Sequence, residues 1–558
     1  MISIAGIISK NLHNKAALTL YENLLTNKVI KYHKINDGSF MAYLGCQNNE
    51  NKILSTTQSE KSLIYDGYLF KQNNETKAIE DWIDKFSSMK SFPLHELEGM
   101  YSLVVWDSIK EILTLNRDVF GSRPLYYYFN EKMDYVIFAS TIDIIIQSIP
   151  SLKWSMNKQY CKSYFMNHAT ADFHLSPITN IQKVLPGEII QFGVNSKYEF
   201  EIINKEKVNY YTAVEEYSDF TNHIGDICEN ILTHFDNINN TKTNVLLSGG
   251  VDSSFISILA LLQKKNISKF IYLDMGDTQA RENVYSLCKN LKRSLEILTL
   301  NRMDRDFLNK SILSMIEPTP STDYPFFYYY ASKNENTNNT IISGHSLDEI
   351  LFLYPWLWNN QEKKWPYLMD EEQWLNNFTS QSMENTDKSI NSEIDNSFKL
   401  CINLLNDPIL RMNSAFSSNE LNIGMPFLSK LLINKSFFQK NGMSGDDYST
   451  NIKSQLIQYL RQILSAKKYN NCSIEKYLNS ICLKKQDAEK GKFNDIITDS
   501  YDLIVEDIDE MKYFISKILS DKGMILFENF YPKKRSAFCF WKYYVFFRWY
   551  YLRNINIQ

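Results

Sequence analysis

A short run at residues 244–254, NVLLSGGVDSS, constrains this chain most, because an apolar strand passes directly through Ser-Gly-Gly into an apolar helix. Glycines let the backbone turn tightly and bring its N–H groups against a polyanion, and a helix N-terminus favours negative charge. Ser248, Ser253 and Ser254 add hydroxyl donors. The order strand, loop, helix therefore predicts a phosphate-binding loop. The alternative without a ligand is a Ser-Gly turn capped by Asp252.

The spacing within this loop narrows the class of nucleotide site. It has neither the G-x-x-x-x-G-K-[ST] pattern of the common nucleotide loop nor the G-x-G-x-x-G of dinucleotide folds. Kinases, GTPases and dehydrogenases are therefore disfavoured. The 60 Lys and Arg against 64 Asp and Glu leave a net charge of −4, which disfavours nucleic acid as a partner.

The eight cysteines stand apart from one another, with no C-x-x-C pair, so neither a zinc site nor a disulfide framework is predicted. We expect a cytoplasmic protein without a signal peptide. No run of about 18 apolar residues occurs, so we also expect no membrane span.

The pattern along the 558 residues predicts two domains. Up to about residue 205, short β runs alternate with turn residues, which predicts an antiparallel sheet domain with helices near residues 76–86 and 156–167. From about residue 215, helix-length segments alternate with apolar strands at residues 244–248, 270–274 and 340–343, which predicts parallel βαβ units. We therefore expect an α+β domain at residues 1–205 and an α/β domain at residues 215–558, with a helical C-terminal region.

Several segments resemble the asparagine synthetase family in the right order. Residues 99–128, 138–146 and 184–192 look like its glutaminase-type domain, whereas SGGVDSS and residues 342–350 and 425–433 look like its synthetase domain. The resemblance implies an N-terminal nucleophile (class II glutaminase-like) sandwich. For the following part of the chain, the resemblance implies an adenine nucleotide α-hydrolase-like domain of the ATP pyrophosphatase class, whose members adenylate a carboxylate and release pyrophosphate.

Two departures from the family concern glutamine hydrolysis. The family uses a cysteine directly after the initiator methionine, where this chain has Ile2, and its N-G-E oxyanion segment reads Asp-Gly-Tyr at residues 66–68. We therefore expect that the first domain makes no ammonia and is structural or a docking surface. The alternative, that Ser3 is the nucleophile, needs both preceding residues to be removed.

A third departure is His345 in the segment SGHSLDE, where asparagine-forming members usually have glutamate and β-lactam synthetases tyrosine. An imidazole with a pKa of about 6.5 suits removal of a proton from an attacking ammonium near neutral pH. The G-H-x-x-D pattern resembles lasso peptide cyclases, which are synthetase-like and lack a working glutaminase. The alternative is a loop histidine that is hydrogen-bonded for structure alone.

Asp252 and Asp348 follow two predicted parallel strands, at the sheet edge where open α/β sheets bind ligands. The resemblance assigns both to Mg²⁺, although a helix cap and a solvated loop acid are the alternatives. In the C-terminal region the resemblance implies a catalytic lysine, and we predict Lys485 in preference to its neighbour Lys484. We pair this lysine with Arg461. Either Lys485 or Arg461 could instead be a solvated charge. The ATP-binding residues that we predict are Leu247, Ser248, Gly249, Gly250, Asp252, Ser253, Ser254, Leu273, Met275, Ser343 and Gly344.

These features predict an ATP- and Mg²⁺-dependent ligase that adenylates an Asp or Glu side chain of a ribosomal precursor peptide and closes a macrolactam with its N-terminal amine. The resemblance implies a leader peptidase and a precursor-recognition protein as partners. The alternatives are a small-molecule amide ligase of the β-lactam or asparagine synthetase type, and a non-catalytic scaffold. The aromatic C-terminal segment predicts a buried helix, with a partner-binding patch as the alternative.

Overall fold

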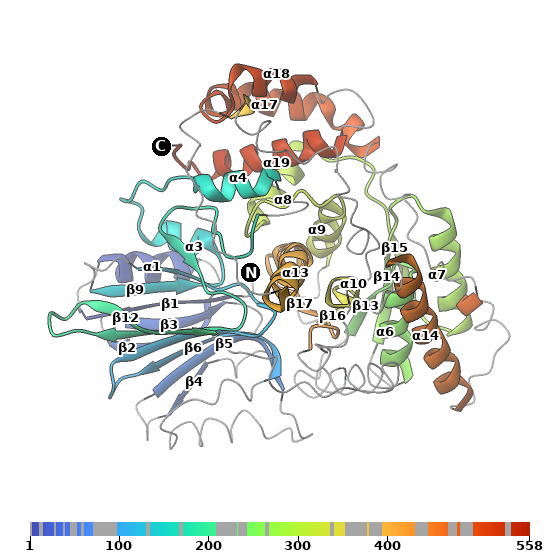
Figure 1. Ribbon diagram of the computed structural model, residues 1–558, viewed down its shortest axis with the longest axis horizontal. Coiled ribbons are helices and arrows are strands. Elements are labelled where there is room, and N and C mark those ends of the chain that lie inside the picture. The colour runs from blue at the N-terminus through green and yellow to red at the C-terminus, as the bar shows by residue number, and fades with distance from the viewer. Residues whose placement is uncertain are drawn as a thin grey trace.

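The computed structural model describes residues 3–10, 15–26, 29–36, 39–44, 53–56, 61–70, 98–129, 134–166, 171–207, 232, 243–262, 267–334, 340–351, 376–378, 393–429, 445–466, 477–479, 495–529 and 537–557. Within these residues the chain forms two stacked antiparallel sheets, a parallel sheet with helices, and a helical C-terminal layer (Figure 1).

The described N-terminal half contains two six-stranded antiparallel sheets. The first has the order β10-β8-β9-β1-β3-β2 and the second the order β12-β11-β7-β6-β5-β4. The strands of the first sheet are β1 (Ser3–Ser9), β2 (Val29–Asn36), β3 (Ser39–Leu44), β8 (Tyr126–Tyr128), β9 (Tyr135–Ala139) and β10 (Ile181–Lys183). Those of the second are β4 (Ile53–Thr56), β5 (Lys61–Phe70), β6 (Glu98–Asp107), β7 (Ile112–Arg117), β11 (Glu188–Val194) and β12 (Phe200–Lys207).

Successive side chains of β1 point to opposite faces of its sheet, and this alternation explains why the two sheets stack. Ile4 and Ile8 pack with residues of the second sheet in one buried cluster. Ala5 and Ile7 point the other way, into a cluster shared with the helices that cover the first sheet. These helices are α1 (Lys15–Thr26), α3 (Ile142–Ser148) and α4 (Lys158–Met166). Both faces of β1 are therefore buried.

The second half is built on a parallel sheet of order β15-β14-β13-β16-β17. Its strands are β13 (Thr243–Leu246), β14 (Ile267–Leu273), β15 (Leu295–Leu298), β16 (Thr340–Ile342) and β17 (Asn422–Gly424). The helices among them are α6 (Val251–Leu262), α7 (Thr278–Asn290), α8 (Arg305–Ser314), α9 (Tyr324–Lys333), α10 (Leu347–Ile350) and α13 (Glu393–Ser417). Since all five strands run in one direction, the loops after β13, β14 and β16 meet at one sheet edge.

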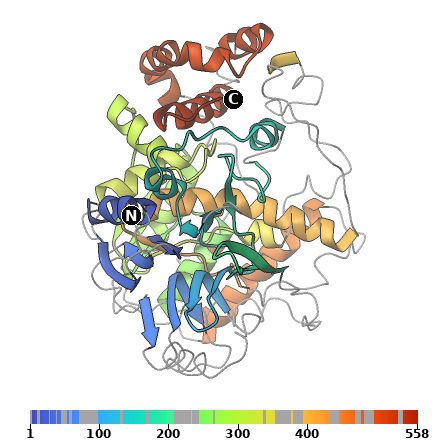
Figure 2. The ribbon, with the colours of Figure 1, turned by 90° about the vertical axis from the view of Figure 1, so that its left-hand side faces the viewer.

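The remaining described helices are α14 (Gly445–Ala466), α17 (Tyr501–Ser516), α18 (Asp521–Asn529) and α19 (Ala537–Leu552). In both views α17, α18 and α19 gather at one end of the molecule (Figures 1 and 2). The aromatic helix α19 is buried, with Trp541 and Trp549 at 0% exposure, and Trp549 donates from Nε1 to the carbonyl of Met315 at 2.9 Å. The burial of α19 fits the predicted core helix and not the surface patch.

Polar contacts join the two halves. The segment after β7 is folded on itself because the Asp118 carboxylate accepts hydrogen bonds from the amides of Tyr101, Phe120 and Ser122. This turn sends Arg123 into the second half, where its guanidinium donates to Oδ1 of Asn413 and to the carbonyl of Ile423, each at 2.6 Å.

The predicted change from antiparallel to parallel strands is observed. The sequence patterns missed β1, β2, β4, β10, β12, β15 and β17, which are edge strands, short strands or runs interrupted by small and charged residues. The helix predicted near residues 76–86 lies outside the described residues, as does most of the segment around the predicted domain boundary. None of the described helices is long and apolar enough to cross a membrane.

Candidate active site

The predicted phosphate loop connects the end of β13 to the start of α6. Gly249 has a φ of +82°, a left-handed conformation that favours glycine, and a Cβ there would lie 3.0 Å from the carbonyl oxygen of Ala280. A Cβ at Gly250 would meet only the Ser248 hydroxyl, at 3.5 Å. Gly249 is therefore required by the turn itself, whereas Gly250 leaves the backbone open to an incoming group.

The three serines of the loop have different surroundings. The Ser253 hydroxyl accepts from the amide of Ser248 at 3.1 Å and lies 2.9 Å from its hydroxyl. The Ser254 hydroxyl donates to the carbonyl of Gly250 at 2.6 Å and pairs with the buried Tyr477 hydroxyl at 2.5 Å. Ser248 and Ser253 thus line the cavity described below, while Ser254 is turned into the protein.

A second loop, residues 343–346 after β16, packs on the first. A Cβ at Gly344 would lie 2.8 Å from the Cα of Ser253, so only glycine lets the two loops approach this closely. Ser346, directly after His345, has a φ of +84°, which is costly for a residue other than glycine. The Ser343 hydroxyl lies 2.5 Å from Nδ1 of His345, which directs Nε2 away from this contact.

Lys453 on α14 lies between the two carboxylates that we predicted as metal ligands. Its Nζ is 2.8 Å from Oδ1 of Asp348 and 3.6 Å from Oδ2 of Asp252. Burial lowers the pKa of Lys453, but the two carboxylates together outweigh this effect and raise it above its ordinary value. The lysine is therefore charged and holds both acids at one point.

Lys453 is not among the residues that the sequence predicts, although it lies in the amphipathic segment that contains Arg461. The available signal was its position beside Ile452, Leu456 and Ile457, which are buried positions of the helix. A lysine on the apolar face of an amphipathic helix needs a buried partner.

These elements enclose a cavity of about 310 Å³. Of the predicted site residues, those that line it are Leu247, Ser248, Gly249, Gly250, Asp252, Ser253, Leu273, Met275, Ser343, Gly344, His345 and Asp348. The side chain of Arg461 is not part of this wall and donates to Oδ1 of Asn479 at 2.5 Å. Lys485 and Lys484 lie outside the described residues. The structure therefore brings together all the described predicted residues except Ser254 and Arg461.

The donor set fits Mg²⁺. Asp252 and Asp348 already share one cation, the Lys453 ammonium, so a single ion can reach both carboxylates. Among the described residues that line the cavity, five carry carboxylates, Asp252, Asp277, Asp323, Asp348 and Glu349, and two carry a lysine or arginine cation, Lys453 and Arg411. A triphosphate entering this cavity needs further positive charge, and Mg²⁺ is usually held by one or two carboxylates together with phosphate oxygens and water.

Residues 66–68, which we predicted to correspond to the oxyanion segment of glutaminases, lie in β5. Asp66 is buried, and Gly67 has a φ of +99° with Met100 so close that no Cβ fits. The cysteines within the described residues, Cys161, Cys288, Cys401 and Cys539, are all buried, and burial raises the pKa of each thiol. None of these four has the exposed, low-pKa environment of a catalytic thiolate.

Comparisons with known proteins find a domain family and two partial relatives. A family model described as a glutamine amidotransferase domain matches residues 50–201. Asparagine synthetase (glutamine-hydrolyzing) 1 of Bacillus subtilis is 22% identical over 308 residues, which cover 54% of this chain and 46% of that protein. A Methanocaldococcus jannaschii protein named as a putative asparagine synthetase (glutamine-hydrolyzing) 1 is 23% identical over 294 residues, which cover 50% of this chain and 49% of that protein.

The chain thus spans about half the length of the curated relatives it matches. Among solved structures, the glutamine phosphoribosylpyrophosphate amidotransferase of B. subtilis, complexed with ADP and GMP, is 10% identical and covers 53% of this chain and 80% of that one. Its TM-score of 0.25 is too low to support a structural conclusion. The chain is therefore similar over about half of its length to two proteins named as asparagine synthetases, and residues 50–201 are similar to a glutamine amidotransferase domain.

Proposed function

We propose that the protein is an ATP-dependent amide-bond-forming ligase of the ATP pyrophosphatase type that adenylates a carboxylate. One observation carries the proposal: a single cavity contains the Ser248–Gly250 loop, the Asp252–Lys453–Asp348 cluster and His345. These are an anion-binding loop, a cation site and a titratable base, which are the three groups that adenylation followed by aminolysis requires.

In the first step, a carboxylate oxygen of the acid attacks the α-phosphorus of ATP, and the bond to the β,γ-phosphates breaks. The backbone N–H groups of the loop and the N-terminus of α6 receive the departing pyrophosphate. Lys453 supplies a fixed positive charge beside it. Mg²⁺ held by Asp252 and Asp348 would neutralise charge on the phosphate oxygens. The products are an acyl-adenylate and pyrophosphate.

In the second step, an amine attacks the acyl carbon, the amide bond forms and AMP leaves. The amine must lose a proton, and His345 is the residue of this cavity best suited to accept it. The Nδ1 atom of His345 lies 2.5 Å from the Ser343 hydroxyl. In the tautomer that this step requires, Nδ1 carries the proton and donates to that hydroxyl, and Nε2 accepts the proton of the amine.

We further propose that the amine comes from the substrate and not from glutamine. Asp66 in place of an amide donor supports this. The four cysteines in the part of the chain that the structure describes are also buried, and burial raises the pKa of each thiol. The histidine at position 345 favours a lasso peptide cyclase-like reaction, in which the N-terminal amine of a precursor peptide attacks its own adenylated Asp or Glu side chain. A leader peptidase and a precursor-recognition protein would then act beside this enzyme.

A second candidate is a ligase for a small acid, and the similarity to asparagine synthetases favours it. The two candidates are separated by incubating the purified protein with Mg²⁺, ATP and two sets of acids: free amino acids, and linear peptides that carry an internal Asp or Glu. Pyrophosphate release and the mass of the product are measured. Release with peptides and a loss of 18 Da from the peptide support the cyclase; release with amino acids alone supports the small-molecule ligase. No release with either set, and no ATP binding, would show a scaffold.

A further inference from the structure

The cavity wall beyond the phosphate loop carries a fixed pair of opposite charges that none of the steps above uses. Asp323 precedes α9 and Arg411 lies on α13, with Nη1 of Arg411 2.7 Å from Oδ2 of Asp323. Their side chains are 17% and 14% exposed, and both line the cavity. Ser321 joins them, since its hydroxyl donates to Oδ1 of Asp323 at 2.6 Å and accepts from Nη1 of Arg411 at 2.7 Å. The Asp323 carboxylate is therefore held in one position at the cavity surface.

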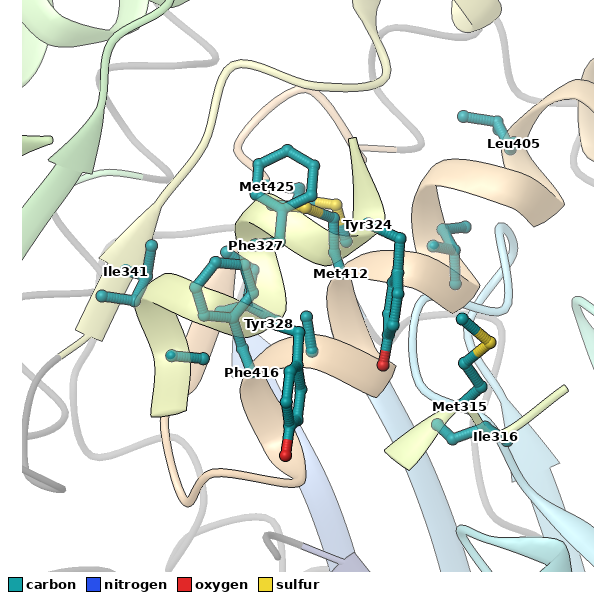
Figure 3. Packing of buried hydrophobic residues seen from close by; sticks show 14 of the residues in the cluster. Met315, Ile316, Tyr324, Phe327, Tyr328, Ile341, Leu405, Met412, Phe416 and Met425 are labelled. Atoms are coloured by element: carbon teal, nitrogen blue, oxygen red, sulfur yellow. The ribbon is translucent and has the colours of Figure 1, made fainter. Parts of the chain in front are cut away.

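This pair is continuous with the site of amide formation. The carbonyl of Asp323 accepts a hydrogen bond from the amide of Phe327 at 3.2 Å, one turn along α9. The Phe327 ring lines the cavity and packs edge-on against the His345 imidazole, with centroids 5.5 Å apart. Phe327 also packs on Phe416 of α13 (Figure 3), which fixes the spacing between the two helices. Asp323, Phe327 and His345 thus follow one another along a single wall.

The charge balance at this wall favours a cation over an anion. Arg411 also lies 3.6 Å from Oδ2 of Asp407, whose Oδ1 accepts from the Thr319 hydroxyl at 2.9 Å. The guanidinium is therefore flanked by two carboxylates, and a substrate carboxylate brought to it from the cavity would meet Asp323, the one of the two that lines the cavity. A carboxylate oxygen can accept two hydrogen bonds, so the contacts of Asp323 to Ser321 and Arg411 are compatible with an ammonium bound at the same carboxylate.

We propose that Asp323 is a specificity-determining residue that receives the amine of the substrate as its ammonium form, beside His345, with Arg411 as the positioning residue for Asp323. This inference rests on the proposed function and names the part of the cavity that takes the nucleophile. The chemistry recognised is a primary ammonium next to a carbonyl, which both a peptide N-terminus and a free amino acid supply. An amine held in this way is oriented before it attacks, which is the entropic contribution expected of a ligase site.

The test uses the full chain with Mg²⁺ and α,β-methylene-ATP, and the same titrations without nucleotide. Three probes are titrated by calorimetry: glycinamide, which mimics a peptide N-terminus, glycine, which mimics an amino acid, and N-acetylglycinamide, which has no ammonium. The variants are Asp323→Asn, which removes the charge, Asp323→Glu, which keeps it, and Asp407→Asn as the matched control. Asp407 contacts the same arginine but is not part of the cavity wall.

We expect glycinamide to bind the wild-type protein and N-acetylglycinamide not to bind. Asp323→Asn should weaken glycinamide binding by about tenfold or more, as for the loss of a charge-assisted hydrogen bond. Asp407→Asn should change the affinity for glycinamide by less than about twofold, and Asp323→Glu should retain part of that affinity. The ratio of glycinamide to glycine affinity tells which amine source the wall prefers.

Equal binding of glycinamide and N-acetylglycinamide by the wild-type protein, or equal glycinamide binding by wild type and Asp323→Asn, would overturn the inference. Failure of the nucleotide analogue to bind would instead count against the proposed function. Because the amine titrations are also run without nucleotide, the two failures are distinguishable.

Discussion

At the scale of single residues, the proposed second step, in which an amine attacks the acyl-adenylate, depends on His345 as the base. We expect His345→Ala to leave acid-dependent pyrophosphate release within a fewfold of wild type and to slow amide formation by about 10²–10⁴-fold, because only aminolysis needs the base. Pyrophosphate and amide are measured in the same reactions. Equal loss of both half-reactions would show that His345 is not the base.

The buried Lys542 gives a second residue-scale prediction, on stability and pH. It lies in α19 with 0% exposure, 5.1 Å above the Tyr164 ring, and burial lowers its pKa to about 7. An unfolded lysine titrates at about 10.4, so between about pH 7 and 10.4 the unfolded chain binds a proton that the folded chain does not. The free energy of unfolding should therefore rise with pH across that window.

Lys542→Met removes this dependence, and we expect it to raise the free energy of unfolding at pH 7.5 by about 1–4 kcal/mol. Urea unfolding at pH 7 and pH 9 measures both effects. The exposed Lys512→Met serves as control and should change neither. A Lys542→Met variant that is less stable than wild type at both pH values would contradict the burial argument.

At the scale of elements, helix α14 carries both Arg461, which the sequence predicts as a catalytic residue, and Lys453, which lines the cavity in the structure. Lys453 contacts both aspartates, whereas Arg461, eight residues on, contacts Asn479. We expect Lys453→Met to lower the rate of acid-dependent pyrophosphate release by about 10²-fold or more, and Arg461→Met to change it by less than about threefold. Similar losses in both variants would contradict the assignment.

The same comparison shows what sequence patterns can and cannot predict here. The position of the loop at residues 248–254 beside the cavity could be predicted, because a glycine-rich turn between a strand and a helix is a local sequence pattern. The positions of His345 and Asp348 could be predicted because the ends of parallel strands lie at one edge of the sheet. Those of Lys453, Asp323 and Arg411 could not be predicted, because helices far apart in the sequence bring them to the cavity. The composition of the loop also predicts Ser254 as an ATP-binding residue, but helix geometry turns its hydroxyl toward Tyr477.

At the scale of the whole molecule, a buried ion pair connects the two halves. Nζ of Lys183 in β10 lies 2.5 Å from Oε1 of Glu317, which precedes α9, and their side chains are 3% and 0% exposed. The hydroxyls of Tyr126 and Tyr160 also donate to Glu317, at 2.5 and 3.2 Å. The carboxylate is thus the common acceptor of three groups from the N-terminal half.

Because removal of one partner leaves a buried charge unpaired, Glu317→Gln should lower the free energy of unfolding by about 3–5 kcal/mol. The double variant Lys183→Met with Glu317→Gln should recover a substantial part of that loss. Denaturant unfolding of the single and double variants gives the coupling energy. Purely additive losses would show that the two side chains are not an interacting pair.

If the cavity of the second half adenylates a carboxylate, the nucleotide product must be AMP, and identifying that product is the decisive experiment. The protein is incubated with Mg²⁺, ATP, hydroxylamine and peptides that contain an internal Asp or Glu, and the nucleotides are separated by chromatography. We expect AMP and pyrophosphate together with a peptide hydroxamate from the wild-type protein, and none of these products from Asp252→Asn or Asp348→Asn. ADP and phosphate from the wild-type protein, or AMP formation that is unchanged in both variants, would contradict adenylation in this cavity.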